Sequence, residues 1–419
     1  MPTHTTATVS AADASRGNEA IQQHIDAVAE RGGGTVAVPS ARYQIHDALR
    51  LRSGVTLVGE PGAVLVLPQS AGCALKEFMG CGLYEFVPEL PELFEVGMGV
   101  RLSDDQAHGF YQTVAGIVAR DGNRFFIDRP AHHDYNPNRH ARATHIFPAI
   151  EGRGVQDVTV RGLTIDGSAE QHDRLNGCRG GGVILLGCRR VTIDQVEVRH
   201  YPGDAVSFQQ CVDVTVGHCH LHHNRGHGLH PGSGSVRYRM HHTRVHDNGG
   251  DGLFYCLRTT HSCCEENELC DNGGDGISIG ERDTDHLIRR NVIRGNAGVA
   301  VRFRSSIATG GERVHVVENQ ISPNTCRQGE HEVVVLAALR HVFIQDNMFT
   351  PSATPVLRAE ASPAEVCFVG NVVTGRPQEP GDVVAPPDAV RFSEPAAFPP
   401  IGPEAATDRD LRHLGCAAG

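Results

Sequence analysis

The clearest candidates for chemistry in this sequence are four arginines and one histidine in the central part of the chain. They are His230, Arg258, Arg282, Arg302 and Arg304. A guanidinium group binds a carboxylate, sulfate or phosphate in bidentate fashion, so the arginines favour an anionic substrate. With His230 or one arginine as the base, these residues suit an enzyme that neutralises a carboxylate and removes the proton next to it. This is lyase or isomerase chemistry.

The same arginines have acidic neighbours, which leaves a second interpretation open. Glu281, Asp283 and Asp285 lie in the same stretch of chain. Ion pairs on a solvated face explain clustered charge as well as an anion site does. The two interpretations differ for Arg302→Leu, which should remove activity without lowering Tm if the arginine serves a substrate. A solenoid that binds a ligand without changing it is a third possibility.

A repeat of 24 residues predicts where these side chains lie. Asn-Gly-Gly-Asp-Gly occurs at 248–252 and again at 272–276, and both asparagines and apolar residues recur at the same step. The asparagines are Asn224, Asn248, Asn272 and Asn296, and the apolar residues are Leu229, Leu253, Ile277 and Val301. A leucine-rich repeat would need several leucines and a helical segment per unit, whereas short β-branched runs between Asn and Gly turns indicate a parallel β-helix. Residues 24 apart then stack as columns about 4.8 Å apart.

Alternation along each strand separates inward columns from outward ones. The apolar column that begins at Leu229 and the column of Pro231, Tyr255, Ile279 and Phe303 should face the core. The outward columns are His230, Phe254, Ser278 and Arg302; Gly232, Cys256, Gly280 and Arg304; and Gly234, Arg258, Arg282 and Ser306. Small residues beside long cationic ones predict a groove with charged walls, in which Ser278 and Phe254 would contact the substrate. A further column contains His227, Asp251 and Asp275, whose carboxylates would contact the substrate or cap their own turns.

The sequence divides into five parts. An amphipathic helix is expected from Asn18 to Arg31, because apolar residues recur there at helical spacing before three glycines. The 24-residue rhythm is absent from 68 to 150, which reads as antiparallel strands. The expected parts are an N-terminal segment (1–17), a capping helix with the first coils (18–67), an inserted β-rich subdomain (68–150), the parallel β-helix (151–375) and a Pro-rich tail (376–419).

Two phrases carry a resemblance to a known family. "GGGTVAVPSARYQIHDALRLRSGVTLVGE" and the "NGGDGISIG" units resemble the pectate-lyase-like superfamily over about residues 18–66 and 151–375. The resemblance implies a right-handed, single-stranded parallel β-helix. Members of the superfamily include polysaccharide lyases, polygalacturonases, epimerases, fructotransferases and binding proteins, so the resemblance specifies the fold and leaves the reaction open.

A hydrolase is the alternative enzyme class. Gly203-Asp204-Ala205, followed one unit later by Gly226-His227-Gly228, resembles part of the polygalacturonase motif and makes Asp204 and His227 catalytic candidates. Ala205 stands where that family has a second aspartate, and inverting hydrolysis needs two carboxyl groups. If the arginine groove is structural, the search moves to Asp204, His227 and the loop that bears His172 and Asp173.

The sequence leaves metal dependence open between no cofactor and a divalent metal. Pectate lyases bind Ca²⁺ through an aspartate cluster that has no clear counterpart here, and the Asp-Pro-His-Asp of mannuronan epimerases is reduced to His230-Pro231-Gly232-Ser233. His218, His220 and His222 alternate along one expected strand. They could bind a transition metal or form a surface stripe.

The composition of the chain limits which binding partners and which cellular compartment are expected. A formal net charge of −11 without basic runs argues against nucleic acid. No stretch has the length of a membrane span and the N-terminus lacks a signal-peptide pattern, so a cytoplasmic protein is expected. The 13 cysteines fit reduced thiols. The absence of Trp removes the aromatic platforms typical of long glycan grooves, so an anionic small molecule or oligosaccharide is favoured over a polymer. The oligomeric state stays open.

Overall fold

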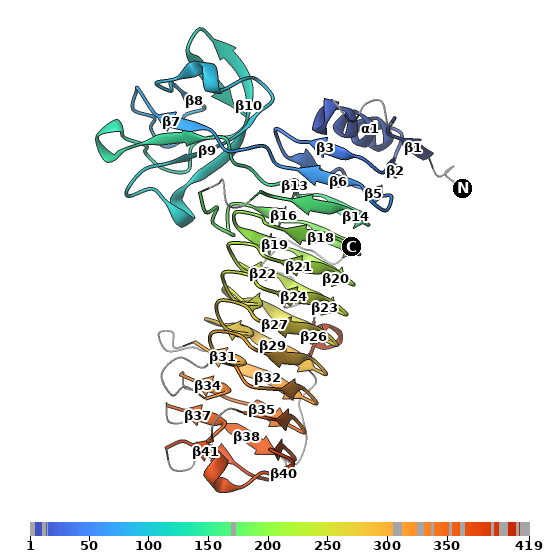
Figure 1. Cartoon of the computed structure of the whole chain (residues 1–419), viewed down its shortest axis with the longest axis vertical. Coiled ribbons are helices and arrows are strands. Elements are labelled where there is room, and N and C mark those ends of the chain that lie inside the picture. Colours follow the sequence, from blue (N-terminus) through green and yellow to red (C-terminus); the bar gives the residue numbers. More distant parts are fainter. Residues whose placement is uncertain are drawn as a thin grey trace.

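The computed structural model describes residues 5–10, 14, 16–168, 173–304, 312–324, 331–336, 339–351, 354–360, 365–386, 389–393, 401–407 and 410. These residues form a long solenoid with three parallel sheets along its sides, and a separate lobe lies beside its N-terminal end (Figure 1). The expected all-β parallel β-helix is confirmed. None of the described helices has both the length and the apolar character needed to span a membrane.

The three sheets of the solenoid are named A, B and C. Sheet A contains β1 (Thr5–Thr8), β2 (Gly34–Val38), β5 (Val55–Gly59), β14 (Gln156–Arg161), β17 (Arg189–Asp194), β20 (Val212–Gly217), β23 (Val236–His241), β26 (Thr260–Glu265), β29 (Thr284–Arg289), β32 (Glu312–Val317), β35 (Val342–Gln345), β38 (Val366–Val369) and β42 (Val390–Arg391). Sheet B contains β3 (Arg42–Gln44), β6 (Val64–Val66), β15 (Thr164–Asp166), β18 (Glu197–Arg199), β21 (His220–His222), β24 (Arg244–His246), β27 (Glu268–Cys270), β30 (Val292–Arg294), β33 (Gln320–Ile321), β36 (Met348–Phe349), β39 (Val372–Val373) and β40 (Arg376–Pro377). Sheet C contains β4 (Leu49–Arg50), β13 (Ile150–Arg153), β16 (Gly181–Leu186), β19 (Asp204–Gln209), β22 (Leu229–Gly232), β25 (Leu253–Phe254), β28 (Ile277–Ile279), β31 (Val301–Phe303), β34 (Val333–Val335), β37 (Leu357–Ala359) and β41 (Val383–Val384).

The register of sheet C follows the 24-residue step of the sequence. Leu229 pairs with Leu253, Leu253 with Ile277, and Ile277 with Val301. All four side chains are buried in the core of the solenoid, as is the second inward column from Pro231 to Phe303. The predicted columns are therefore correct, because one-residue slips would have turned these side chains outward.

Asparagine side chains form a continuous ladder inside one line of turns. The Nδ2 of Asn224 donates to Oδ1 of Asn248 (2.8 Å), and the same bond links Asn248 to Asn272 and Asn272 to Asn296 (2.9 Å each). Each Oδ1 also accepts the backbone N–H of the preceding asparagine in the ladder. The predicted stack of four asparagines is confirmed, and it continues to Asn324.

A second ladder lies at a different turn of the coil and was not predicted from the sequence. It runs through Asn267, Asn291, Asn319, Asn347 and Asn371, with Nδ2 to Oδ1 distances of 3.0 to 3.1 Å. Its steps are 24, 28, 28 and 24 residues because some coils carry longer loops, which hides the repeat from a fixed-period search. This ladder ends on Oε1 of Gln378, at 2.9 Å from Asn371 Nδ2.

The helix α1 (Asn18–Glu30) lies over the N-terminal end of the solenoid, next to β2 (Figure 1). Its buried face includes Ile21, Ile25 and Val28, which is the apolar stripe expected from the sequence. The helix ends before Gly33, whose positive φ of 103° and close approach to the carbonyl of Gly54 exclude a side chain. The helix therefore covers core residues that the first coil would expose.

The lobe is an antiparallel sheet whose strands differ in length, and it is formed by the part of the chain that lacks the repeat. Its strand order is β7 (Gly72–Ala74), β12 (Arg142–Thr144), β9 (Gly99–Ser103), β10 (Thr113–Asp121), β11 (Arg124–Ile127) and β8 (Glu85–Phe86). It has its own apolar core, which includes Phe86, Phe94 and Phe125. Near the other end of the chain, β41 and β42 add to sheets C and A, and the short helix Pro403–Ala405 contacts β23 and β26.

Replacing Asn272 by alanine tests the first ladder. Asn272 accepts two bonds from Asn248 and donates to Asn296 and to the carbonyl of Val245, so its loss removes four buried hydrogen bonds and leaves the backbone N–H of Asn248 without its acceptor. Each unpaired buried group costs about 1–3 kcal/mol, and we expect the free energy of unfolding to fall by ~3 kcal/mol or more. Denaturant unfolding measures this. The control Asn138→Ala, at an exposed position in the lobe, should change it by less than about 0.5 kcal/mol; equal effects would contradict a stabilising ladder.

The acidic end of the same ladder predicts a pH dependence. Asn324 donates to Glu332 (Nδ2 to Oε2, 2.7 Å), and burial raises the pKa of Glu332 to about 7 against the opposing hydrogen bonds from Asn324. When the pKa of a carboxyl is raised on folding, its contribution to the free energy of unfolding is lost as pH rises. For Glu332 this loss occurs between about 4.3, the pKa in the unfolded chain, and 7. We therefore expect Glu332→Gln to raise Tm at pH 8 and to leave it unchanged at pH 4.5.

Gln378 offers the matched control, because it accepts the last bond of the second ladder as an amide. The variant Gln378→Glu should show the reverse pattern, with a lower Tm at pH 8 than the unaltered chain and a smaller difference at pH 4.5. A Glu332→Gln effect that is the same at both pH values would mean that ionisation of Glu332 plays no part.

Candidate functional site

A cavity of about 470 Å³ lies where sheet C meets the loop after residue 172 and the edge of the lobe. It is lined by Gly109, Arg174, Asn176, Gly177, Cys178, Asp204, His227, His230, Phe254 and Cys256. Three sources contribute these residues: successive rungs of the solenoid, the loop that leaves the repeat, and the lobe. The cavity has a volume typical of small-molecule sites.

Asp204 and His230 form a buried pair at the base of the cavity. Asp204 begins β19 and His230 lies in β22, one rung further along, and His230 Nδ1 is 2.6 Å from Asp204 Oδ2. Both side chains are at most 5% exposed. Burial alone would lower the pKa of His230, but Asp204 and the Cys256 sulfur outweigh burial and raise the pKa to about 9. Nδ1 therefore carries a proton toward Asp204, and Nε2 faces the other way.

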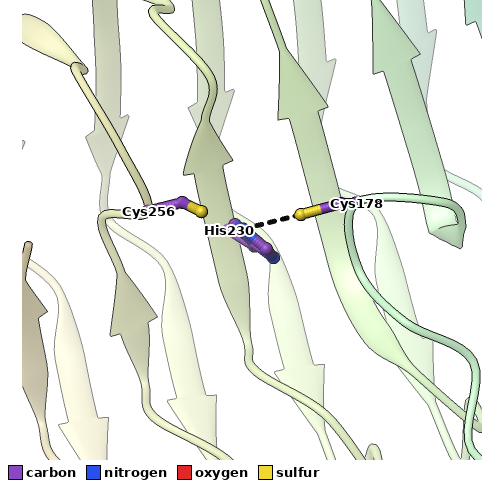
Figure 2. Close-up of side chains that lie close together, drawn as sticks. All are labelled: Cys178, His230 and Cys256. Carbon is purple, nitrogen blue, oxygen red and sulfur yellow. Dashed lines mark hydrogen bonds between the residues drawn. The ribbon is translucent and has the colours of Figure 1, made fainter. Parts of the chain in front are cut away.

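Two cysteines lie on either side of the His230 ring (Figure 2). Cys178 comes from the loop and its Sγ is 3.9 Å from His230 Nε2, while Cys256 follows β25. The two sulfurs and Nε2 all lie within 4.8 Å of one another. The neighbouring Cys178 thiol lowers the pKa of Cys256 to about 4, with further help from His230 and against the effect of burial, and the pKa of Cys178 is raised in turn. Cys256 is therefore the more acidic thiol of the pair.

Close backbone packing holds the loop over this pair. A Cβ on Gly177 would lie within 2.5 Å of both Asp204 Oδ2 and His230 Nδ1, so only glycine allows the loop to approach so closely. Asn176 accepts the N–H of Cys178 (3.0 Å) and orders the turn. Two contacts tie the loop to the lobe: Asp173 pairs with Arg101 at 2.6 Å, and Arg179 stacks on Phe110. His172 lies outside the described residues.

His227 lies beside Asp204 and cannot act as a base through Nδ1. Its Nδ1 accepts the backbone N–H of Asp251 at 2.8 Å, which requires an unprotonated nitrogen there. Burial lowers the pKa of His227 to about 4, so the ring is neutral and carries its proton on Nε2. The ring is stacked on Phe254, with centroids 4.3 Å apart. His227 therefore offers the cavity a hydrogen-bond donor.

The aspartates of the same column cap the turns of the coil. Asp204 Oδ1 accepts the N–H of His227, Asp251 Oδ1 accepts that of Asp275, and Asp275 Oδ1 accepts that of Val299. His227 Nδ1 takes the place of a carboxylate oxygen at its step. The turn-capping interpretation of Asp251 and Asp275 is the one the structure supports. Burial, together with the neighbouring Asp275, raises the pKa of Asp251 to about 6.

The four arginines expected to form one anion groove have separate surroundings, which favour the ion-pair interpretation for Arg302, while the expected substrate contacts stay a prediction. Arg302 binds Asp275 in bidentate fashion (Nε to Oδ2, 2.6 Å; Nη2 to Oδ1, 3.0 Å). Arg304 covers the Phe254 ring and donates to Ser278 Oγ and to backbone carbonyls. Arg258 and Arg282 are exposed turn residues with positive φ. The 24-residue period predicted the columns in which the arginines lie. It did not predict the acceptors in neighbouring columns, such as Asp275 for Arg302 and Ser278 for Arg304.

Arg174, Cys178 and Cys256 are the site residues that the sequence interpretation missed. Arg174 lines the cavity, and within the described part of the chain no side-chain hydrogen bond or ion pair is found for it. Cys178 and Arg174 sit in a loop that interrupts the repeat, so no column predicted them. Cys256 was placed in an outward column, next to the column of His230. The signal available in the sequence was that Cys178 and Cys256 lie in the coils before and after His230.

The histidine stripe lies on sheet B, on a different side of the coil. His220 Nε2 is 2.7 Å from His246 Nε2, and His222 Nε2 is 3.1 Å from Glu197. The rings of His222 and His246 are stacked, with centroids 5.0 Å apart, and the ring of His220 is tilted by 30° to that of His222. Their nitrogens are close enough for a metal, but two of the rings are stacked and His222 is bonded to Glu197, so both interpretations of the stripe stay open. His218 lies apart from them and pairs with Asp194.

A family model described as the right-handed beta helix region matches residues 110–269 and 148–321, which together span half of the chain. The chain belongs to this right-handed β-helix family, and its fold is that of the pectate-lyase-like superfamily. No curated protein sequence matches it significantly.

Solved structures show the same architecture at low sequence identity. The A-module of mannuronan C-5 epimerase AlgE4 from Azotobacter vinelandii is 17% identical, with a TM-score of 0.55 and coverage of 90% of this chain and 96% of that chain. A polygalacturonase from Erwinia carotovora is 12% identical, with a TM-score of 0.54 and coverage of 92% and 97%. An exopolygalacturonase from Thermotoga maritima is 14% identical, with a TM-score of 0.51 and coverage of 90% and 88%. These likenesses establish the fold.

The pairing of Arg302 changes the outcome expected for Arg302→Leu. Without the guanidinium, the nearly buried Asp275 carboxylate loses its bidentate partner, so we expect the free energy of unfolding to fall by about 2 kcal/mol or more. Denaturant unfolding measures the loss. Arg282→Leu is the control, because it breaks an exposed pair with Glu281 worth at most about 1 kcal/mol. An unchanged stability in Arg302→Leu would restore the original substrate-binding interpretation.

Proposed function

We propose that this chain is an enzyme that acts on an anionic carbohydrate by proton transfer, as a lyase or an isomerase. The observation that carries the proposal is the position of Arg174 in the same cavity as the centre formed by Cys178, His230 and Cys256. The cationic group suits a carboxylate of the substrate, and the centre suits the movement of a proton. This centre replaces the four-arginine groove as the site.

The protonation states within the cavity support this reaction class. Cys178 and His230 lower the pKa of Cys256, and Asp204 and Cys256 raise the pKa of His230, so without a bound metal the centre would contain one group that can accept a proton and one that can donate a proton. The neutral His227, with its proton on Nε2, adds a donor for a substrate oxygen. Arg174 would stabilise the negative charge that develops on the carboxylate when the neighbouring proton leaves.

Hydrolysis by a carboxylate pair fits the cavity less well. Asp204 is the one carboxylate among the residues that line it. Both of its oxygens are engaged, Oδ1 with the N–H of His227 and Oδ2 with His230. Since glycoside hydrolysis of this type needs a free acid and a free base, the geometry favours the lyase or isomerase.

Carbohydrate as the substrate class follows from the structural likenesses. The similar structures are named as a mannuronan C-5 epimerase and as polygalacturonases, and these names refer to carbohydrate polymers. The cavity volume suits a short segment of such a molecule. A non-catalytic binding protein would not need a buried thiolate and imidazolium beside the ligand.

The test incubates the chain with oligomers of mannuronate, guluronate and galacturonate in D2O. A lyase forms a conjugated unsaturated product that absorbs in the ultraviolet, and an epimerase incorporates deuterium at the carbon that bears the carboxylate. New reducing ends without either signal would contradict the proposal and favour a hydrolase. Binding without any product would favour the non-catalytic alternative.

Arg174→Gln tests the role of the cationic group. A charge-assisted hydrogen bond to a carboxylate contributes about 1.5–3 kcal/mol, so we expect kcat/KM to fall by about 10- to 100-fold on a uronate substrate. Steady-state kinetics measures this change. The control Arg258→Gln, at an exposed turn, should leave kcat/KM within about twofold of the original value. Equal values for both variants would show that Arg174 does not bind the substrate.

A further inference from the structure

The half-buried sulfurs of Cys178 and Cys256 differ in their surroundings from the fully buried thiols of the solenoid. Cys188, Cys211 and Cys219 each donate to a backbone carbonyl two residues away in sequence, at 3.1 to 3.5 Å. The hydrogen-bond partners found for the Cys178 and Cys256 sulfurs in the described part of the chain are each other and His230. These two thiols are therefore directed at a common point beside Nε2, which ordinary packing does not require.

We propose that Cys178, His230 and Cys256 bind a zinc ion through their two sulfurs and Nε2, with a fourth coordination position open to the cavity. Two cysteines and one histidine with an open fourth position are a known ligand set of catalytic zinc. Soft thiolate ligands together with imidazole also select zinc over calcium or magnesium, which prefer oxygen ligands.

The distances agree with this assignment. Bond lengths of about 2.3 Å for Zn–S and 2.0–2.1 Å for Zn–N in a tetrahedral site place a sulfur about 3.6 Å from the nitrogen. The observed distance from Cys178 Sγ to His230 Nε2 is 3.9 Å, and the largest separation among the three ligand atoms is at most 4.8 Å. Shifts of about 1 Å or less would therefore close the site around an ion.

The surroundings of His230 match those of a metal-binding histidine. A ligating imidazole usually donates its other N–H to a carboxylate, which fixes the tautomer and the ring orientation. Asp204 fills this position at 2.6 Å from Nδ1, and Gly177 brings the loop backbone directly over the pair. Asp204 is therefore a positioning residue for the ion. The loop that bears Cys178 is tied to the lobe through Asp173 and Arg179, which holds the third ligand in place.

This inference goes beyond the proposed function, because it holds whatever the substrate is. Its consequence for the reaction is specific. If both sulfurs bind zinc, the ion would supply a proton acceptor in their place, because zinc lowers the pKa of bound water to about 7. The three ligand residues line the same cavity as Arg174 and His227, so the ion would lie beside the proposed substrate site.

The experiment measures metal in the full-length chain without substrate. We expect about one zinc per chain by elemental analysis after removal of loosely bound metal. Replacement by Co²⁺ should produce thiolate-to-cobalt charge-transfer absorption in the near ultraviolet. Cys178→Ser and Cys256→Ser should each abolish that absorption and weaken zinc binding by at least 100-fold in competition with a chelator. Asp204→Asn should weaken binding by about 10- to 100-fold while the absorption persists.

Two controls separate this site from other metal ligands. Cys81→Ser removes an exposed thiol in the lobe and should change neither zinc binding nor the absorption. His220→Gln disrupts the histidine stripe on sheet B, so any zinc that this variant fails to bind was held by the stripe. The thiolate-to-cobalt absorption should be unchanged in this variant. Circular dichroism confirms that each variant keeps its β structure.

Other outcomes would overturn the inference. Cobalt absorption without a thiolate band, or zinc binding that survives in both cysteine variants, would show that the sulfurs are not ligands. A mass two hydrogens lower than expected, with Cys178 and Cys256 joined in one peptide after digestion, would show a disulfide in place of the metal site. Zinc binding without turnover of any uronate would leave this inference intact and contradict only the proposed function.

Discussion

The asparagine ladders are the interaction on which the rest of the structure depends. Each coil must turn three times, and each turn buries backbone N–H and C=O groups that no strand can pair. Asparagine supplies a donor and an acceptor on one short side chain, so that it satisfies its own coil and the next one together. Because each ladder step links equivalent positions, the ladders also fix the register between coils. Once the register is fixed, every other column along the solenoid follows.

The site uses the same principle and departs from it at one step. The column of Asp204, His227, Asp251 and Asp275 passes hydrogen bonds from rung to rung, as the asparagines do, but it lies at the edge of sheet C where side chains can reach a cavity. Asp204 uses one oxygen for the column and is left with the other for His230. The Asp204 carboxylate therefore makes one hydrogen bond that stabilises the coil and another that orients His230. Both side chains lie buried where the coil and the cavity meet.

The sequence predicted those features that repeat. The inward columns and the first asparagine ladder follow from a fixed step of 24 residues, and Asp204 and His227 were singled out by the partial resemblance to the polygalacturonase motif. The features that it could not predict break that step. Cys178 and Arg174 lie in a loop with no equivalent in other coils, the second ladder includes steps of 28 residues, and the partner of Arg302 lies 27 residues away in a neighbouring column. An analysis of single columns places Arg302 on the outward face of the solenoid. It does not show the diagonal neighbour Asp275, which binds the Arg302 side chain.

The attachment of the loop to the lobe sets an order of assembly during synthesis. The lobe is complete by about residue 144, before the loop that bears Cys178 has been made. The loop can then dock on Arg101 and Phe110 as it emerges, while His230 and Cys256 arrive with the next coils. Because domains generally fold as the chain is made, a finished lobe acts as a template that receives the first sulfur ligand and holds it for the second. A chain in which the lobe folds late would complete its coils around an empty position.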